Sequence, residues 1–288
     1  MEPVENCVRK FLKDCKNNIK PVNLFKFIEF TFNTVKMVLN DYSSYYSNHI
    51  YTQPKLFTIL AIKIYTNCTY RELTDLLELS DTIQKYLHLK KIPHYTTLQK
   101  FFQRLPTSIL QELNKQILLN HEINGEIIAL DGSGFTNDYA DKYYAIIRRK
   151  ERKSYVKNHI SIDVDSRLIL HYAAQRGPRF DTRFALAAIR NIKKYKPKYI
   201  LADRAYDTEP IRKCINEEAK AEDQIPLKTR AKTGHYRLKS KKQFNQEIYS
   251  RRNNVESIFS VIKRIFNGTN RRRSLQLSNK ETKLKDVL

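Results

Sequence analysis

Hydrophobic side chains recur at helical spacing through the first third of the chain. The pattern predicts one helix before Pro21, marked by Val8, Phe11 and Leu12, and a second helix after it. The apolar positions of this second helix are Leu24, Ile28, Phe32, Val35 and Leu39. Pro54 opens a third helix, from Leu56 to Tyr65. These residues predict an all-helical first part.

Two short helices with capping boxes are predicted next. Thr69-Tyr70-Arg71-Glu72 starts one of them, and Thr96-Thr97-Leu98-Gln99, which follows Pro93, starts the other. The turn segment between them contains Lys90, Lys91 and His94. The pair resembles a helix-turn-helix, whose second helix, from Thr96 to Leu105, could enter a major groove. A helical bundle that only packs on its neighbour is an equally good interpretation.

The pattern changes near Gly125, where short apolar runs replace the helical periodicity. Glu126 to Leu130 predicts a buried strand that ends in Asp131-Gly132-Ser133-Gly134. Tyr155 to Val164 alternates, and the turn at Asp165-Ser166 leads into Arg167 to Ala174, which predicts a hairpin. One face of its first strand would hold Ile160, Ile162 and Val164, and the other face would hold His159, Ser161 and Asp163.

Helices and strands are then predicted in alternation. A helix runs from about Asp181 to Ile192, and Tyr199 to Ala202 is a second buried strand, followed by Asp203. A helix from Thr208 to Ala219 and a fifth strand from Gln224 to Leu227 complete this order, which is typical of an α/β fold. Between Lys228 and Lys242 there are seven basic residues and no acidic one, and we interpret this tract as a mobile basic loop.

A last long helix is predicted from Tyr249 to Phe266. At about 100° per residue, one stripe of it lies within roughly 80° and contains Tyr249, Arg252, Glu256, Phe259 and Lys263. The neighbouring stripe contains Val255, Ile258, Ile262 and Ile265, which predicts a buried face. The first stripe suits a carboxylate held beside a polyanion, although a solvated face with ordinary helical ion pairs would give the same pattern.

Charge then narrows the class of partner. The chain has 288 residues, of which 41% are hydrophobic, and its net charge is +23. Residues 1–125 carry 16 basic and 11 acidic side chains, whereas residues 126–288 carry 37 and 19. A basic excess of this size indicates a nucleic-acid partner, bound mainly by the second part of the chain.

Other classes of protein are disfavoured. The four cysteines, Cys7, Cys15, Cys68 and Cys214, lie too far apart for a zinc knuckle, and no histidine lies at ligand spacing from them. No apolar run reaches the roughly 20 residues that span a bilayer, and no signal peptide is apparent. We therefore expect an intracellular protein with reduced cysteines and no membrane partner.

Three acids occupy notable positions. Asp131 and Asp203 follow buried strands, and Glu256 lies on the polar stripe of the last helix. If these carboxylates converge, they can bind two divalent cations, which stabilise the attacking and leaving oxygens of an in-line phosphoryl displacement. Mg²⁺ favours such oxygen ligands. A single aspartate after a strand is more commonly a helix cap or a turn residue.

These motifs resemble the DDE transposases of bacterial and archaeal insertion sequences. The similarity lies in Leu130-Asp131-Gly132-Ser133, in Leu201-Ala202-Asp203-Arg204-Ala205-Tyr206-Asp207, and in the Tyr-x2-Arg-x3-Glu-x6-Lys signature. Tyr249, Arg252, Glu256 and Lys263 match this signature. The resemblance covers roughly residues 50 to 280, and it implies an RNase H-like catalytic core at 123–288, preceded by an all-helical N-terminal domain at 1–122.

The resemblance also implies a reaction and its residues. Asp131, Asp203 and Glu256 would be the catalytic residues and would hold two Mg²⁺ ions, for which Mn²⁺ could substitute. Double-stranded DNA, both element ends and target, would be the substrate of a homodimer in a cytoplasmic, nucleoid-associated complex. Tyr249, Arg252 and Lys263 would contact its phosphates. For Lys157 and His159, DNA contact and a simple outward strand face are both open interpretations.

Two departures from the family limit what the resemblance implies. The family continues past the final helix into a closing segment, whereas this sequence stops at Leu288. The stretch from Leu227 to the last helix is too short for the β-domain that some relatives insert there, so a DNA hairpin intermediate is not implied. A regulatory DNA-binding relative and a nuclease with the same core remain alternatives to a transposase.

Overall fold

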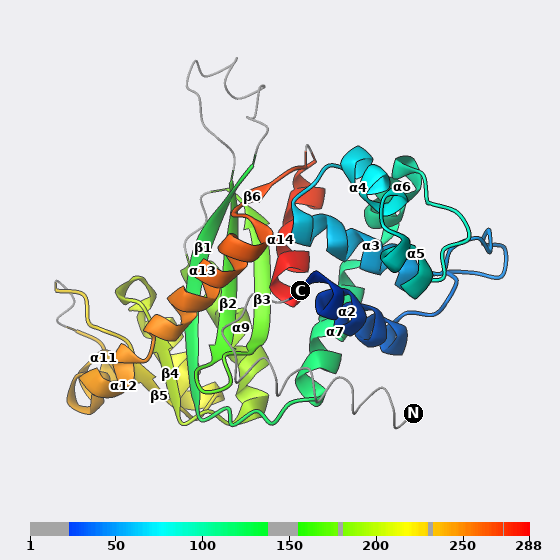
Figure 1. Cartoon of the computed structure of the whole chain (residues 1–288). Coiled ribbons are helices and arrows are strands. Elements are labelled where there is room, and N and C mark those ends of the chain that lie inside the picture. Colours follow the sequence, from blue (N-terminus) through cyan, green and yellow to red (C-terminus); the bar gives the residue numbers. More distant parts are fainter. Residues whose placement is uncertain (1–22, 138–154, 178–180, 230–232, 273) are drawn as a thin grey trace, which may run out of the picture. The chain divides into compact units, whose positions relative to one another are not determined.

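The computed structural model describes residues 23–137, 155–177, 181–229, 233–272 and 274–288 (Figure 1). The chain divides into two units, Met1–His121 together with Leu288, and Glu122–Val287. The helix predicted around Val8 and Leu12 lies outside the described residues. No described helix is long and apolar enough to cross a bilayer.

Helices alone build the described part of the first unit. They are α2 (Leu24–Val38), α3 (Gln53–Thr66), α4 (Tyr70–Glu78), α5 (Asp81–Tyr86), α6 (Tyr95–Arg104) and α7 (Thr107–Leu119). The predicted apolar stripe of α2 is buried, with Ile28 and Val35 each 1% exposed. Pro54 lies in the first turn of α3, where a missing backbone N–H costs nothing. The expectation of an all-helical N-terminal part is confirmed.

Of the two predicted capping boxes, only the first is present. Glu72 N donates to Thr69 Oγ1 at 3.3 Å and Thr69 N donates to Glu72 Oε2 at 2.6 Å. The prediction at Thr96 is wrong, because the N-cap of α6 is His94, two residues earlier, and the His94 ring accepts from Thr96 N. In addition, α5 lies between α4 and α6, so these two helices are not joined by a simple turn.

The second unit contains a mixed sheet in the order β3-β2-β1-β4-β5. Its strands are β1 (Ile127–Asn137), β2 (Tyr155–Asp163), β3 (Ile169–Arg176), β4 (Tyr199–Ala202) and β5 (Glu222–Gln224), and β6 (Thr269–Asn270) pairs with the end of β1. β1 and β2 are antiparallel, as are β2 and β3, whereas β4 and β5 run parallel to β1. With helices packed on the sheet, this is an RNase H-like core, as expected.

β1 is longer than predicted. It pairs with β4 only as far as Leu130 and Ala202, but it continues to Asn137 because β2 supplies hydrogen-bond partners from Asp131 onward. Asp131 therefore lies within β1, at the point where its pairing with β4 ends. β5 is also displaced from the prediction, since it covers Glu222–Gln224 rather than Gln224 to Leu227.

Both faces of β2 are buried. The alternation predicted an outward face with His159, Ser161 and Asp163, but each of these side chains is 0% exposed. Helix α9 (Thr182–Ile192) covers that face, where Phe184 stacks on His159 at 5.7 Å between ring centroids. On the other face Asn158 Nδ2 donates to Asp286 Oδ1 of α14 (Leu275–Val287) at 2.6 Å. The prediction was wrong because alternation cannot reveal a helix that covers the polar face.

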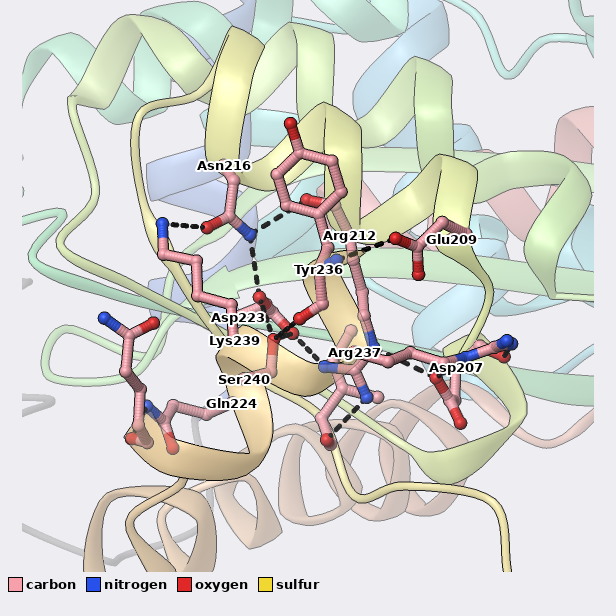
Figure 2. A network of polar contacts seen from close by, with 12 residues as sticks. Asp207, Glu209, Arg212, Asn216, Asp223, Gln224, Tyr236, Arg237, Lys239 and Ser240 are labelled. Carbon is pink, nitrogen blue, oxygen red and sulfur yellow. Dashed lines mark hydrogen bonds and ion pairs between the residues drawn. The ribbon is translucent and has the colours of Figure 1, made fainter. Parts of the chain in front are cut away.

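The basic tract between Lys228 and Lys242 is not a mobile loop throughout. From His235 to Gln243 it forms the helix α11. Two elements precede α11 in the chain. They are α10 (Glu209–Lys213) and the π-helical turn η3 (Cys214–Glu218), which continues directly from α10. Several of its polar side chains bond to that region rather than to solvent (Figure 2).

The last long helix is interrupted. α12 covers Gln246–Ser250 and α13 covers Asn253–Phe266. At Arg251 and Arg252 the backbone N–H groups bond to the third residue before them instead of the fourth, so the chain turns there. Within α13 the buried residues are Val255, Phe259, Ile262 and Phe266. Phe259 thus belongs to the core rather than to the polar stripe, because at about 100° per residue it lies on the edge of that stripe next to Val255, Ile262 and Phe266.

Asp286 makes the stability of the fold dependent on pH. Burial raises the pKa of Asp286 to about 7, although the hydrogen bond from Asn158 Nδ2 (2.6 Å) and the charges of Lys285 and Lys283 favour ionisation. A raised pKa means that this carboxyl contributes stability fully below its ordinary value of 3.8, and that this contribution is lost as the pH rises through about 7.

Asp286→Asn should remove this dependence. Asparagine keeps an acceptor for Asn158 and never ionises, so the free energy of unfolding should exceed that of the wild type at pH 8 and fall less between pH 5 and pH 8. Urea denaturation at the two pH values measures this. The exposed Asp75 provides the control, since Asp75→Asn should leave the profile unchanged. An unchanged profile in Asp286→Asn would contradict the assignment.

Candidate active site

Asp131 lies on the face of β1 that α13 covers. Its Oδ1 accepts from Gly132 N at 2.8 Å, and its Oδ2 lies 3.4 Å from Arg252 Nη1. Burial raises the pKa of Asp131, and the charges of Asp181 and Glu256 add to the effect, while the Gly132 hydrogen bond and Arg252 oppose it. Asp131 is therefore a half-buried carboxylate in a group of charges.

Asp203 follows β4 directly and is exposed. The register that pairs Leu130 with Ala202 brings Asp203 next to Asp131 at the neighbouring strand end. The buried phenol of Tyr206 lies close to both. Its pKa is well above the ordinary value, first because of burial and then because of the charges of Asp181, Asp131 and Asp203. Three carboxylates thus act on one buried hydroxyl.

Glu256 is linked to Asp131 by ion pairs with Arg252. Glu256 lies in the first turn of α13, and Arg252 Nη2 donates to its Oε1 at 2.5 Å. Because Nη1 of the same guanidinium pairs with Asp131, Arg252 bridges two acids that are 125 positions apart in the sequence. The Tyr249 ring centroid lies 5.9 Å from the guanidinium carbon.

Lys263 lies two turns further along α13 and faces the same side of β1. Its Nζ donates to Ser133 Oγ at 2.7 Å and lies 5.4 Å from the centre of the Phe135 ring. Burial lowers the pKa of Lys263, and the charge of Lys157 acts in the same direction. Arg252 thus contacts both Tyr249 and Glu256 even though the helix is broken, whereas Lys263 lies further along β1 at Ser133.

Lys157 and His159 belong to the opposite face of the sheet. In the β1–β2 register they pair with Gly134 and Gly132, the positions that alternate with Asp131 and Ser133. His159 is fully buried and burial lowers its pKa to about 3, so the interpretation as an outward strand face is wrong, and its DNA contact stays a prediction. Lys157 Nζ pairs with Asp181 Oδ1 at 2.8 Å, and its DNA contact stays a prediction.

Asp181 and Tyr206 were not singled out in the sequence as site residues. In the sequence Asp181 marks only the start of a predicted helix, and Tyr206 is only part of a motif. The absence of a side chain at Gly132 lets the Asp181 carboxylate lie against the backbone of β1. A Cβ at position 132 would overlap the Asp181 carboxylate and lie 2.8 Å from Lys157 Cε. No local sequence pattern indicates either residue, because the packing of distant segments on the sheet places both of them at the site.

The described residues contain no group of three or more His, Cys, Asp or Glu side chains arranged to hold a metal ion. The donor set of Asp131, Asp203 and Glu256 has the oxygen chemistry that Mg²⁺ prefers. The arrangement does not fit as it stands, because the Arg252 guanidinium pairs with two of the three carboxylates.

A pocket of about 590 Å³ opens beside Asp203. Arg204 and Lys241 contribute cations to its lining, and the rings of Phe244 and Tyr249 lie 5.4 Å apart at another part of it. The combination of cations, aromatic rings and one carboxylate suits a charged, partly apolar ligand.

A buried charge network joins the segment after Asp203 to α11 (Figure 2). Arg212, which is 0% exposed, donates Nε to Asp207 Oδ1 at 3.0 Å and Nη2 to the Ile225 carbonyl at 2.9 Å, and its Nη1 contacts Asp223. Arg237 Nε also donates to Asp207 Oδ1, at 2.9 Å, and Ser240 Oγ bonds to Asp223.

This network fixes the start of the segment that leads to Glu256. Burial works to raise the pKa of Asp207, but hydrogen bonds from Lys228 N, Arg237 and Arg212 outweigh it, and the pKa is lowered. The carboxylate therefore stays ionised between two arginines. Because Asp207 follows Asp203 by four residues, the network ties the Asp203 segment to α11.

A family model described as a transposase DDE domain matches residues 123–284. No curated protein matches the chain.

Two solved structures show a weak likeness. The Mos1 mariner paired-end complex with Mn is 10% identical, with 85% of this chain and 79% of that chain covered, at a TM-score of 0.25. A pre-cleavage Mos1 transpososome is 10% identical, with 99% and 95% covered, at a TM-score of 0.26. TM-scores this low carry no argument about this chain.

Proposed function

This chain belongs to the transposase DDE domain family, and we propose that it cuts the ends of an insertion element and joins them to target DNA. The reaction would be an in-line phosphoryl transfer: water attacks the phosphodiester at the element end, and the released 3′-hydroxyl then attacks a phosphodiester of the target. We assign the element to the prokaryotic group whose transposases carry the Tyr-Arg-Glu-Lys signature.

One observation carries the proposal. Asp131 lies within β1 at the point where its pairing with β4 ends, Asp203 directly follows β4, and Glu256 is linked to Asp131 through a shared arginine. The three acids come from distant segments of residues 126–288, where basic residues outnumber acidic ones by 37 to 19. Acids set among an excess of basic residues are what a metal-dependent enzyme acting on a polyanion requires.

We propose Asp131, Asp203 and Glu256 as the catalytic residues and as ligands of two Mg²⁺ ions, for which Mn²⁺ can substitute. Paired divalent ions lower the barrier to phosphoryl transfer by stabilising charge on the attacking and leaving oxygens. The donor oxygens suit this role, and the two Arg252 ion pairs oppose it in the DNA-free protein. The ion pairs would therefore have to open before the site is loaded.

Cationic side chains around these three acids would hold the DNA strand. Arg252 can grip a phosphate with two parallel hydrogen bonds, and Lys263 offers a point charge beside β1. The pocket next to Asp203 is lined by Tyr249, Arg204 and Lys241. These positions support phosphate contacts on both sides of the proposed cleavage site.

We keep 1–122 and 123–288 as the proposed domains and assign sequence recognition to the first of them, in a homodimer on DNA. On α6 the exposed residues Gln99, Lys100, Gln103 and Arg104 form a polar face without an acid. On the segment before α3, Tyr45 and Tyr46 are 87% and 93% exposed. Amide, cationic and aromatic side chains of this kind are suited to base edges and phosphates.

The deciding experiment incubates the full-length protein with duplex DNA that carries the flanking element ends and Mg²⁺. Gel analysis scores cut and joined products separately. Both products are expected from a transposase, cutting without joining would indicate a nuclease, and binding without either would indicate a regulatory relative. Full activity in EDTA would contradict the metal assignment.

Two sets of substitutions should separate phosphate contact from sequence recognition. Lys263→Ala should weaken binding to element-end and unrelated duplexes by a similar factor and lower the salt slope by about one ion. The double variant Gln99→Ala, Lys100→Ala should weaken element-end binding more than unrelated binding. Fluorescence anisotropy at several salt concentrations measures both. If the α6 variant lost affinity equally for both duplexes, α6 would not read sequence.

A further inference from the structure

We infer that Arg252 keeps divalent metal ions out of the DNA-free protein and that a DNA phosphate opens the site by taking over its guanidinium. This inference rests on the proposed function, because it concerns the same three carboxylates. It adds an order of assembly to that function, in which DNA precedes metal.

The contacts of Arg252 carry the inference. One guanidinium nitrogen pairs with Asp131 and the other with Glu256, at 3.4 and 2.5 Å. The Arg252 and Asp131 side chains are 15% and 19% exposed, so the first pair is largely shielded from water. One cation thus already forms ion pairs with two of the three proposed metal ligands.

A metal ion must therefore compete with an intramolecular cation. The fraction of molecules whose carboxylates are open sets the apparent metal affinity, and every tenfold decrease in that fraction weakens binding tenfold. Carboxylate oxygens bonded to a guanidinium cannot offer the same lone pairs to a metal.

DNA can release this block because phosphate is a better partner for arginine than two separate carboxylates. A single phosphate accepts two parallel bonds from one guanidinium, whereas Asp131 and Glu256 each accept one. Lys263 lies on the same face and adds attraction for the strand. Once Arg252 binds the strand, both carboxylates are free for metal, so DNA and metal should each strengthen the binding of the other.

The test measures Mn²⁺ binding to the full-length protein without DNA, by the electron paramagnetic resonance signal of free Mn²⁺. We expect Arg252→Gln to bind Mn²⁺ at least about tenfold more tightly than the wild type. Lys263→Ala is the matched control, because it removes one positive charge from the same face and contacts Ser133 rather than either carboxylate. Its affinity should change by less than about threefold. Equal gains in both variants would reduce the effect to net charge and overturn the inference.

Further variants distinguish a failure of this inference from a failure of the proposed function. Asp131→Asn added to Arg252→Gln should abolish the gain. If Mn²⁺ binding did not depend on Asp131, the proposed metal site would fail. If it did depend on Asp131 but Arg252→Gln gave no gain, only the role of Arg252 would fail. Duplex DNA should tighten Mn²⁺ binding to the wild type and not to Arg252→Gln. If that variant does not fold, Arg252→Lys, which cannot bridge both carboxylates in the same way, should show the same direction of change.

Discussion

Glu256→Gln should reduce DNA cleavage on the order of a thousandfold and leave DNA binding unchanged or tighter. The substitution keeps the shape of the side chain and removes the charge that would hold a metal, and a metal clamp contributes several kcal/mol to phosphoryl transfer. It also removes repulsion between this carboxylate and the phosphates. Cleavage rates on element-end duplexes and anisotropy with the same duplexes measure the two effects.

The structure indicates that this variant will fold. The Glu256 side chain is 54% exposed, and ion pairs at such positions contribute little to stability because water screens them. Glu247→Gln, at an exposed position on α12, is the control and should leave cleavage unchanged. Loss of fold and DNA binding together in Glu256→Gln would show that Glu256 is only a structural partner of Arg252.

Arg212→Met should lower the free energy of unfolding by about 3–5 kcal/mol, because it leaves buried carboxylates without their cation. Asp223 loses an ion pair in a position that is 2% exposed, and Asp207 loses one of its two arginines. Methionine fills a similar volume, so the loss comes from charge rather than from a cavity. Urea denaturation followed by circular dichroism gives the value.

Arg190→Met provides the comparison for this prediction. Arg190 also binds a carboxylate with two nitrogens, Nε to Glu218 Oε2 at 2.9 Å and Nη2 to Oε1 at 3.0 Å, but this pair lies at the surface. Its loss should shift the midpoint of denaturation only slightly. Equal shifts in the two variants would mean that the network in Figure 2 does not depend on burial for its strength.

Local patterns were sufficient for most of the fold. The stripe of Ile28, Phe32 and Val35 predicts α2 because helical spacing alone decides which side chains share a face. The hairpin of β2 and β3 follows from alternation and a turn. Boundaries were less certain: β1 extends to Asn137 because β2 pairs with it, and the sequence of β1 contains no sign of that partner.

Local patterns also predicted part of the candidate site, and they missed the contacts made by distant segments. Asp131 and Asp203 were found because each follows a run of apolar residues, and parallel strands that pair bring such positions together. His159 was misjudged because α9 covers its face, and the tract before Lys242 was misjudged because Asp207 holds Arg237 from 30 residues away. Each error concerns a partner distant in the sequence.

The sequence by itself indicated a helical first part, an α/β second part and the three acids proposed for the site, because spacing, apolar runs and residue type are local properties. The RNase H-like class followed from the resemblance of its motifs to a known family. Only the tertiary structure decided what surrounds those acids. It joined Arg252 to both Asp131 and Glu256, covered both faces of β2 and surrounded Arg212 with Asp207 and Asp223. Contacts of this kind depend on how distant segments pack, and the energy of a charge depends on the burial that this packing creates.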